Sequence, residues 1–317
     1  MLTDKKILIT GASGTLGKMI AGALASDNEV WGLARYSDEE ALREAREAGI
    51  IPVSVNLAKP DFTNLPDDFT YVLHFAHMRG GNDVFPESVA INAVGPGLLM
   101  QHCRTVAAAL IVSSTAVFTP NADVWHPLSE RDPIGGAFAP WAPTSPMSKV
   151  SLEATARLAA EAFGMPITIA RLNTTYGPGR GMKGGGMPVA DMEAVARGEV
   201  IRTFADPYPH SPIHHADMVD QLEPLLHAAA IPAVTVNWCG DEIVTQREWC
   251  ELAGELSGRP PELVVGHIPS APCGNVSDAT LRRSITGPCK RSFNQSYREL
   301  YAQFVANDAS QATYRSV

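Results

Sequence analysis

A glycine-rich segment near the N-terminus has the spacing of a phosphate-binding loop. The segment TGASGTLG, residues 10–17, lies between an apolar run and a helical pattern, and its glycines are Gly11, Gly14 and Gly17. Glycine permits a tight turn and lets the backbone approach a pyrophosphate, while the following helix offers free N–H groups and its positive dipole end. The sequence therefore predicts dinucleotide binding here. The contact residues predicted in this loop are Gly11, Ser13, Gly14, Thr15, Leu16 and Gly17.

The residue that ends the next apolar run indicates which dinucleotide fits. An NAD site places an acid there, about 20 residues after the glycine loop, to hold the ribose 2′-hydroxyl. In this chain the run ends Leu33-Ala34-Arg35, without an acid. An arginine can pair with a 2′-phosphate through two hydrogen bonds and a full charge. The sequence therefore favours NADP(H) bound by Arg35, with NAD(H) as a second cofactor and a solvated surface arginine as the plain alternative.

A serine and a lysine four residues apart form another candidate site. In PTSPMSKVSLE, residues 143–153, Ser145 and Lys149 share one face of a predicted helix. Serine followed by proline is also a favoured helix opening, with serine as the N-cap and proline at the first helical position. We therefore predict that Ser145 chiefly caps this helix.

Strand-length apolar runs alternate with helical patterns in the first half of the chain, and these elements must position the candidate residues. The predicted strands cover 6–10, 29–35, 71–76, 110–118 and 166–172, and the predicted helices cover 15–26, 38–49 and 148–164. Such alternation indicates an α/β fold, a doubly wound parallel (Rossmann) sheet with helices on both faces. Glycine and proline are more frequent later. We therefore predict a dinucleotide-binding domain at 1–176 and a smaller, mostly substrate-binding lobe at 177–317, with some segments returning to the main sheet.

The composition narrows the classes of partner and compartment. A net charge of −9 over 317 residues argues against nucleic acid as a partner. The five cysteines are odd in number and show no C-x-x-C pair, which predicts reduced thiols in a cytoplasmic protein. No signal-peptide pattern is visible and no apolar run approaches ~18 residues, so no membrane partner is expected. The histidines show neither H-x-x-x-H nor H-E-x-x-H, so no metal site is predicted.

Eight blocks of the chain, taken in order, resemble the extended short-chain dehydrogenase/reductases, the NAD(P)-dependent epimerase/dehydratase family. The resemblance covers nearly the whole chain and is more specific than any one block. It implies an NAD(P)-dependent oxidoreductase, epimerase or dehydratase, a small-molecule substrate and a homodimer. The blocks are TGASGTLG (10–17), HFAH (74–77), INAVG (91–95), SSTAVF (113–118), HPLSERDP (126–133), SPMSKVSLE (145–153), RLNTTYGPG (171–179) and SPIHHADMVD (211–220).

The resemblance also implies roles for individual residues. Ser114 matches the catalytic serine or threonine that hydrogen-bonds the reacting oxygen. Lys149 matches the lysine that binds the nicotinamide ribose and lowers the pKa of a catalytic tyrosine, and Ser145 stands where that tyrosine would be. Further cofactor contacts are implied for Asn56, Leu57, Phe75, Ala76, His77 and Asn92, and substrate contacts for Ser114, Thr115, Asn173, Thr174 and His210.

Three positions depart from the family pattern. An aliphatic hydroxyl at Ser145 is a much weaker acid than a phenol and reaches less far, and losing a positioned acid or base typically costs ~10²–10⁴-fold in rate. The asparagine of the RxxN motif falls on Thr174, with Asn173 one residue early, and the arginine that grips a nucleotide-sugar diphosphate falls on His210. These changes point away from a typical UDP- or dTDP-sugar substrate.

The leading interpretation is an NADP(H)-dependent enzyme that acts at a hydroxyl or carbonyl carbon of a small, sugar-like substrate, with a non-standard proton donor. Water, the substrate or a cleft residue would supply the proton, and the cleft candidates are His77, His126, His210 and Tyr208. Two alternatives remain open: an NADP(H)-binding sensor or pseudoenzyme without redox turnover, and a lyase or isomerase that uses the cofactor structurally. The missing tyrosine favours the alternatives, whereas Ser114, Lys149 and the glycine loop favour an enzyme.

Overall fold

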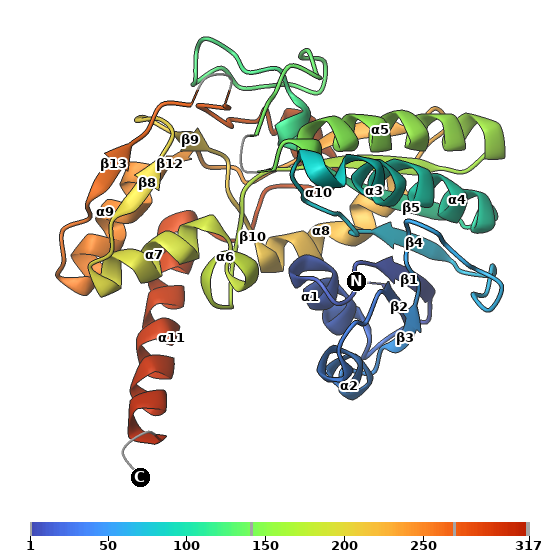
Figure 1. The fold of residues 1–317 in the computed structure, drawn as a ribbon, viewed down its shortest axis with the longest axis horizontal. Coiled ribbons are helices and arrows are strands. Elements are labelled where there is room, and N and C mark those ends of the chain that lie inside the picture. The colour runs from blue at the N-terminus through green and yellow to red at the C-terminus, as the bar shows by residue number, and fades with distance from the viewer. Residues whose placement is uncertain (1, 140–141, 269–270, 315–317) are drawn as a thin grey trace.

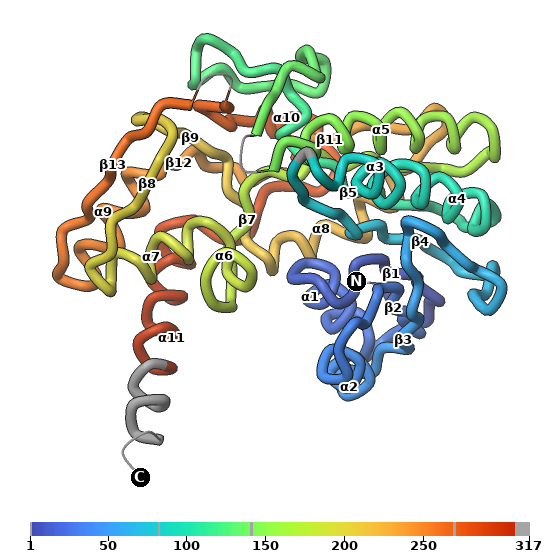
Figure 2. Tube along the Cα trace, in the orientation of Figure 1, coloured from blue at the N-terminus to red at the C-terminus, as the bar shows by residue number. Residues whose placement is uncertain are grey.

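A parallel sheet lies at the centre of the larger of the two regions of the fold (Figures 1 and 2). The computed structural model describes residues 2–139, 142–268 and 271–314. The described residues give the sheet seven strands in the order β11-β6-β5-β4-β1-β2-β3, and every neighbouring pair is parallel. The order reverses between β1 and β4, and sheets of this kind bind ligands in the crevice at that point. The strands are β1 Lys6–Thr10, β2 Glu29–Ala34, β3 Ile51–Ser54, β4 Tyr71–His74, β5 Ala108–Ser114, β6 Ile167–Leu172 and β11 Val234–Trp238.

Alternate residues of β1 show that the sheet is buried on both faces. Ile7 and Ile9 pack in one apolar cluster with residues of α1 and α8, whereas Leu8 packs in a second cluster with residues of α4 and α5. Because successive side chains of a strand point to opposite faces, helices must cover both. Figure 1 shows these two helix layers on either side of the strands. The helices of this region are α1 Thr15–Leu24, α2 Glu39–Glu47, α3 Phe85–Val89, α4 Gly95–His102, α5 Thr144–Phe163 and α8 His215–His227. The π-helical segment η2 Ala90–Val94 joins α3 to α4, and two short 3₁₀ helices are η1 Asn82–Val84 and η3 Thr115–Val117.

The doubly wound parallel sheet expected from the sequence is confirmed, but several predicted boundaries are wrong. The strand predicted at 71–76 ends at His74, and the helices predicted at 15–26 and 38–49 are Thr15–Leu24 and Glu39–Glu47. The strand predicted at 110–118 begins at Ala108 and ends at Ser114, because residues 115–117 turn into η3. The helix predicted at 148–164 begins at Thr144, one turn earlier than its apolar pattern indicated. The differences at Ser114 and Thr144 both lie on the carboxyl-end side of the sheet.

A third apolar cluster lies outside the two sheet layers, in the region drawn at the left of Figure 1. Tyr176, Trp249 and Tyr297 are its largest buried side chains. The strand β11 comes from the same half of the chain and joins the main sheet beside β6. The division of the chain at residue 176 stays a prediction. The elements of this half are α6 Gly181–Gly184, α7 Met187–Arg197, α9 Gln246–Ser257, α10 Thr280–Thr286 and α11 Phe293–Tyr314, with strands β7 Thr175–Tyr176, β8 Ile201–Thr203, β9 Pro209–His210, β10 Ile213–His214, β12 Val244–Thr245 and β13 Leu263–Val265.

Candidate functional site

The glycine loop between β1 and α1 packs so closely against neighbouring backbone atoms that a side chain at Gly11 or Gly17 would collide with them. Gly11 has φ +71°, and a Cβ there would lie 2.8 Å from the backbone nitrogen of Ala76. A Cβ at Gly17 would lie 2.2 Å from the carbonyl oxygen of Gly11. Among the described residues no side chain caps α1 at Gly14, and the first turn holds no acid, so its N–H groups are left for an anion. The loop therefore fits the pyrophosphate of a dinucleotide.

The other predicted residues of this loop differ in their surroundings. Ser13 and Thr15 are exposed, whereas Leu16 is half-buried and packs on the first apolar cluster. The Thr15 hydroxyl donates to the carbonyl oxygen of Lys183 in α6, which brings the C-terminal half of the chain against the glycine loop.

Arg35 directly follows β2, and its side chain is exposed. Asn56 is also exposed, and its side-chain oxygen accepts from the backbone N–H of Ala58, 3.0 Å away, so it shapes the turn after β3. Leu57 is buried in the second apolar cluster. The contacts that Arg35, Asn56 and Leu57 make within the described residues do not show whether they bind the cofactor, so these three assignments stay predictions.

The loop that follows β4 lies against the glycine loop. Thr10 Oγ1 is 2.8 Å from His74 Nδ1 and accepts from the backbone N–H of Ala76. Phe75 is half-buried, with its ring centroid 6.4 Å from that of Trp238. The Asn92 side chain binds both backbone groups of Met78, the residue after His77. It accepts from Met78 N at 2.7 Å and donates to Met78 O at 2.8 Å. The backbone that carries His77 is therefore fixed.

The start of α5 corrects the prediction for Ser145. The N-cap position is Pro143, and Ser145 lies inside the first turn without capping it. The Ser145 hydroxyl instead pairs with His77, with Oγ 2.8 Å from Nε2. Pro146 fits there because the first N–H groups of a helix have no acceptor within the helix. Ser145 thus faces the β4 loop, a partner that local sequence could not show.

Lys149 lies on the next turn of α5 and is almost fully buried, with 5% of its surface exposed. Its ammonium nitrogen donates to the carbonyl oxygen of Val112 in β5 at 2.6 Å. Burial, followed by the positive charge of Arg79, lowers the pKa of Lys149 to about 7. A lysine poised near neutrality at the carboxyl end of the sheet can hold hydroxyl groups and tune a neighbouring acid.

A buried ion pair below Lys149 fixes the helix to the sheet. Glu153 accepts two hydrogen bonds from Arg171 of β6, both 2.9 Å long, and one from Ser113 of β5 at 2.7 Å. Burial alone would raise the pKa of Glu153, but the hydrogen bonds and charge of Arg171 keep it lowered. Sequence reasoning missed this pair, since its members lie 18 residues apart on different elements.

Ser114, at the end of β5, and Thr115, directly after it, differ in burial and in hydrogen bonding. Ser114 is half-buried, and its oxygen accepts from the backbone N–H of Ala116 at 3.1 Å. Among the described residues none accepts from its hydroxyl hydrogen. Thr115 is buried, with 4% of its surface exposed, and it donates to Leu172 O at 3.3 Å. The geometry therefore suits Ser114 as a substrate contact better than Thr115.

The predicted substrate residues of the C-terminal half form a buried network. Asn173 donates to Asn275 O and to Ser277 Oγ, both at 2.8 Å. His210 is 2% exposed, and its Nδ1 lies 2.9 Å from Thr174 Oγ1. Burial lowers the pKa of His210 to about 3, so its ring is neutral. A neutral buried ring cannot clamp a diphosphate as an arginine does.

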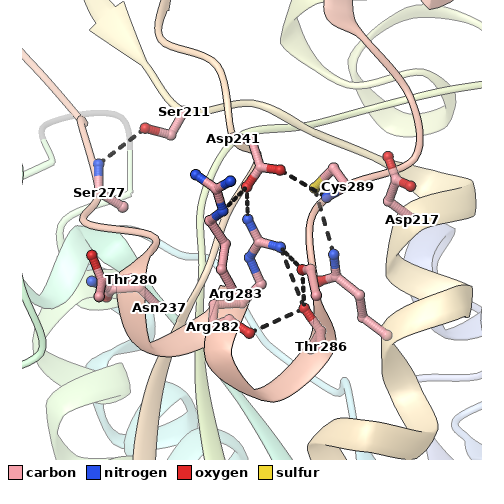
Figure 3. Close-up of polar contacts among 12 residues, drawn as sticks. Ser211, Asp217, Asn237, Asp241, Ser277, Thr280, Arg282, Arg283, Thr286 and Cys289 are labelled. Carbon is pink, nitrogen blue, oxygen red and sulfur yellow. Dashed lines mark hydrogen bonds and ion pairs between the residues drawn. The ribbon is translucent and has the colours of Figure 1, made fainter.

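A cluster of polar contacts anchors the chain after α10 to the end of β11 (Figure 3). Asp241 accepts from the buried guanidinium of Arg282, lies 3.8 Å from Arg283, and accepts from the backbone N–H of Cys289 at 2.8 Å. Arg282 also donates to the carbonyl oxygen of Gly287 at 2.8 Å. The cluster holds α10, which follows the segment that supplies Asn275 and Ser277 to the network described above.

The described residues hold neither a metal-binding cluster nor a membrane-spanning helix. No three His, Cys, Asp or Glu side chains within them gather as they would around a metal ion. Nor does any helix in the described ranges combine the length and apolar character needed to cross a membrane.

Comparisons with known proteins agree with this architecture. The model of the NAD dependent epimerase/dehydratase family matches residues 7–219. A comparison with curated proteins found no match. Among solved structures, UDP-N-acetylglucosamine 4-epimerase from Methanobrevibacter ruminantium M1, in complex with UDP-N-acetylmuramic acid, is 19% identical with a TM-score of 0.81, over 96% of this chain and 100% of that chain.

Two further solved structures contain NAD. UDP-glucuronic acid 4-epimerase from Bacillus cereus, in complex with UDP-glucuronic acid and NAD, is 18% identical with a TM-score of 0.78, over 94% of this chain and 99% of that chain. UDP-glucose 4-epimerase from Thermus thermophilus, in complex with NAD, is 19% identical with a TM-score of 0.75, over 94% of this chain and 98% of that chain. At these identities the likeness shows the shared fold.

Proposed function

The chain belongs to the NAD dependent epimerase/dehydratase family, and from this premise we propose that it is an NADP(H)-dependent enzyme acting at a hydroxyl or carbonyl carbon of a small, sugar-like substrate. The observation that carries the proposal is the glycine loop, whose shape fits a pyrophosphate, beside a buried lysine and a half-buried serine. The bound cofactor would supply the hydride acceptor or donor. Lys149 would hold the nicotinamide ribose, and Ser114 would donate to the reacting oxygen.

The proposed substrate lacks a nucleotide diphosphate. The three solved structures named above are UDP-sugar epimerases, two of them bound to UDP-linked ligands. In this chain His210 takes the place of the family's diphosphate-gripping arginine, and it is neutral, buried and bonded to Thr174. A free sugar, sugar acid or related hydroxyl compound suits such a cleft better than a UDP sugar.

The cofactor preference is tested by replacing Arg35. In the wild-type protein NADPH should bind more tightly than NADH, because the exposed guanidinium can pair with the 2′-phosphate. Arg35→Ala should weaken NADPH binding roughly 10–100-fold, the loss expected for charge-assisted hydrogen bonds, and should leave NADH binding unchanged. Titration of the cofactor fluorescence measures both. Arg46→Ala, which removes another exposed arginine, is the control. Equal affinities for NADPH and NADH in the wild type would contradict the proposal.

We also propose a homodimer, formed through an apolar surface of α4 and α5. These two helices pack side by side (Figure 1). Four apolar side chains of η2, α4 and α5 are exposed, and a contiguous apolar surface is typical of a protein–protein interface. They are Val94 at 55%, Leu98 at 42%, Met147 at 49% and Leu158 at 68%.

Sedimentation at micromolar concentration should show a dimer, and Leu158→Glu should shift it to monomer, because a carboxylate would then be buried at the interface. Val305→Glu alters an exposed apolar residue of α11 and should leave the dimer intact. A wild-type protein that sediments as a monomer would contradict the proposed interface.

A second candidate function is NADP(H) binding without redox turnover, as in a sensor. The serine at position 145 favours it, since it removes the family's phenol. Bleaching of the reduced-nicotinamide absorbance by a candidate substrate separates the enzyme from the sensor.

The cytoplasm is the proposed compartment, supported by described cysteines that are all unpaired.

A further inference from the structure

We propose that His77 and Ser145 together move the proton that a tyrosine moves elsewhere in the family, with the Ser145 hydroxyl toward the substrate and the His77 imidazole behind it. The proposal rests on the proposed function, since it needs a cofactor that exchanges hydride with the substrate. It names the proton donor of the reaction and explains how a serine can occupy the tyrosine position.

The contact between the two side chains is direct and is held from both sides. Ser145 Oγ lies 2.8 Å from His77 Nε2, across 68 residues of sequence. On the histidine side, Asn92 bonds both backbone groups of Met78. On the serine side, Thr144 Oγ1 donates to the carbonyl oxygen of Gly80 at 2.9 Å. The β4 loop and the start of α5 are therefore joined around this pair.

The position of the pair matches the reaction that the fold supports. Ser145 lies one helical turn before Lys149, on the same face of α5. His77 lies in the loop after β4, next to the strand that carries the glycine loop. Both side chains are half-buried. The loop after β4 follows a strand at the switch point of the sheet, where sheets of this kind bind their ligands.

The surroundings of His77 keep its ring neutral. Burial acts first, followed by the positive charges of Lys149 on α5 and Arg79 on the same loop. Together they outweigh the raising effect of the Asn92 side chain and hold the pKa of His77 well below 6.5. Burial lowers the pKa of His74, at the end of β4, to about 3, so that ring is neutral as well. A neutral imidazole accepts a hydrogen bond at one nitrogen. Nδ1 is buried and has no partner among the described residues. If Nδ1 carries the ring proton, Nε2 accepts from Ser145.

The proton then has a complete route in both directions. The nicotinamide, when bound, would accept the C–H hydrogen of the substrate carbinol as hydride. The O–H proton passes to Ser145 Oγ while the proton of Ser145 passes to His77 Nε2, so the C=O bond forms and His77 becomes an imidazolium. In the reverse direction His77 returns the proton through Ser145 to the carbonyl oxygen. The pair ends each cycle unchanged after epimerisation.

The other histidines considered from the sequence are committed elsewhere. His126 Nε2 pairs with Asp132 at 2.9 Å in the loop before α5. His210 is bonded to Thr174, and its ring packs 4.4 Å from Tyr208 and 5.4 Å from Trp249 between ring centroids. Of these candidates, His77 alone contacts the position of the missing tyrosine.

The first test is nitrogen NMR of the histidine side chains in the full-length protein without cofactor. The signal of His77 is identified by its loss in His77→Gln. At pH 7 the proposal expects Nε2 to be unprotonated and Nδ1 to carry the proton. The Nε2 shift should change in Ser145→Ala and stay unchanged in Ser151→Ala, which removes a hydroxyl bonded to its own helix. A protonated Nε2 at pH 7 would overturn the relay, and so would an Nε2 chemical shift that stays unchanged in Ser145→Ala.

The second test is turnover of NADP⁺ with D-glucose, D-galactose, UDP-glucose and UDP-glucuronic acid as probes. For any probe that the wild type oxidises, kcat should fall ~10²–10⁴-fold in Ser145→Ala and in His77→Gln. The double variant should be no slower than either single variant, since the two groups act as a unit. Additive losses would overturn the relay. Absence of NADPH binding in the wild type would instead refute the proposed function, so the two failures are distinguishable.

Discussion

Gly17→Ala is expected to weaken NADPH binding by at least ~100-fold, which corresponds to about 2.7 kcal/mol. The added Cβ would lie 2.2 Å from the carbonyl oxygen of Gly11 and 2.7 Å from its carbonyl carbon. Both are backbone atoms, so the loop itself must move. Because the loop presents its N–H groups to the pyrophosphate, the movement removes several charge-assisted hydrogen bonds, each worth ~1.5–3 kcal/mol. Fluorescence titration of NADPH measures the loss.

Gly22→Ala is the matched control for this variant. Gly22 lies in the same helix, is exposed, and no described atom lies within 4 Å of a Cβ placed there. NADPH affinity should stay unchanged, and the free energy of unfolding should rise by ~1 kcal/mol because alanine favours the helix. A folded Gly17→Ala protein that binds NADPH as tightly as the Gly22→Ala protein would show that the loop is not the cofactor site.

Lys149→Met is expected to reduce cofactor affinity and, without cofactor, to flatten the pH dependence of stability. The pKa of Lys149 is about 7 in the folded protein, against a reference value of 10.5. Between these values the unfolded chain binds more protons than the folded one, so the free energy of unfolding rises with pH by up to about 1.4 kcal/mol per unit. Below pH 7 both states are protonated at this residue, and the contribution is constant. Methionine has no proton to lose, so the variant lacks this rise.

Chemical denaturation of the wild type and the variant at pH 7, 8 and 9 measures the difference between their slopes. Comparing the two proteins cancels the titration of the other groups. Lys59→Met removes an exposed lysine and should keep the wild-type slope. A Lys149→Met protein with the wild-type slope, or with unchanged NADPH affinity, would contradict the burial and the role assigned to this lysine.

The sheet could be predicted from the sequence because it depends on local patterns. Apolar runs such as KILIT and YVLH are short enough for strands and alternate with helical segments, and the glycine spacing marks the turn after β1. These signals lie within a few residues of one another. Several of their ends were misplaced, including those at Ser114 and Thr144, where segments distant in sequence meet.

The candidate site could be predicted only in part, because its partners are distant in sequence. The prediction of Ser145 as a cap used its neighbour Pro146, but its hydroxyl bonds His77 across 68 residues. Glu153 and Arg171 gave no signal of pairing, although they lock α5 to the sheet. His210 was expected to face substrate, and the structure buries it against Thr174. Pairings of this kind depend on how the elements pack, which no local spacing records.

A crystal structure of the protein grown with saturating NADP⁺ tests the central claim most directly. The pyrophosphate should lie at the glycine loop and the start of α1, the 2′-phosphate against Arg35, and the nicotinamide beside Ser145 and His77. A glycine loop without dinucleotide under these conditions, or a nicotinamide turned away from Ser145, would contradict it.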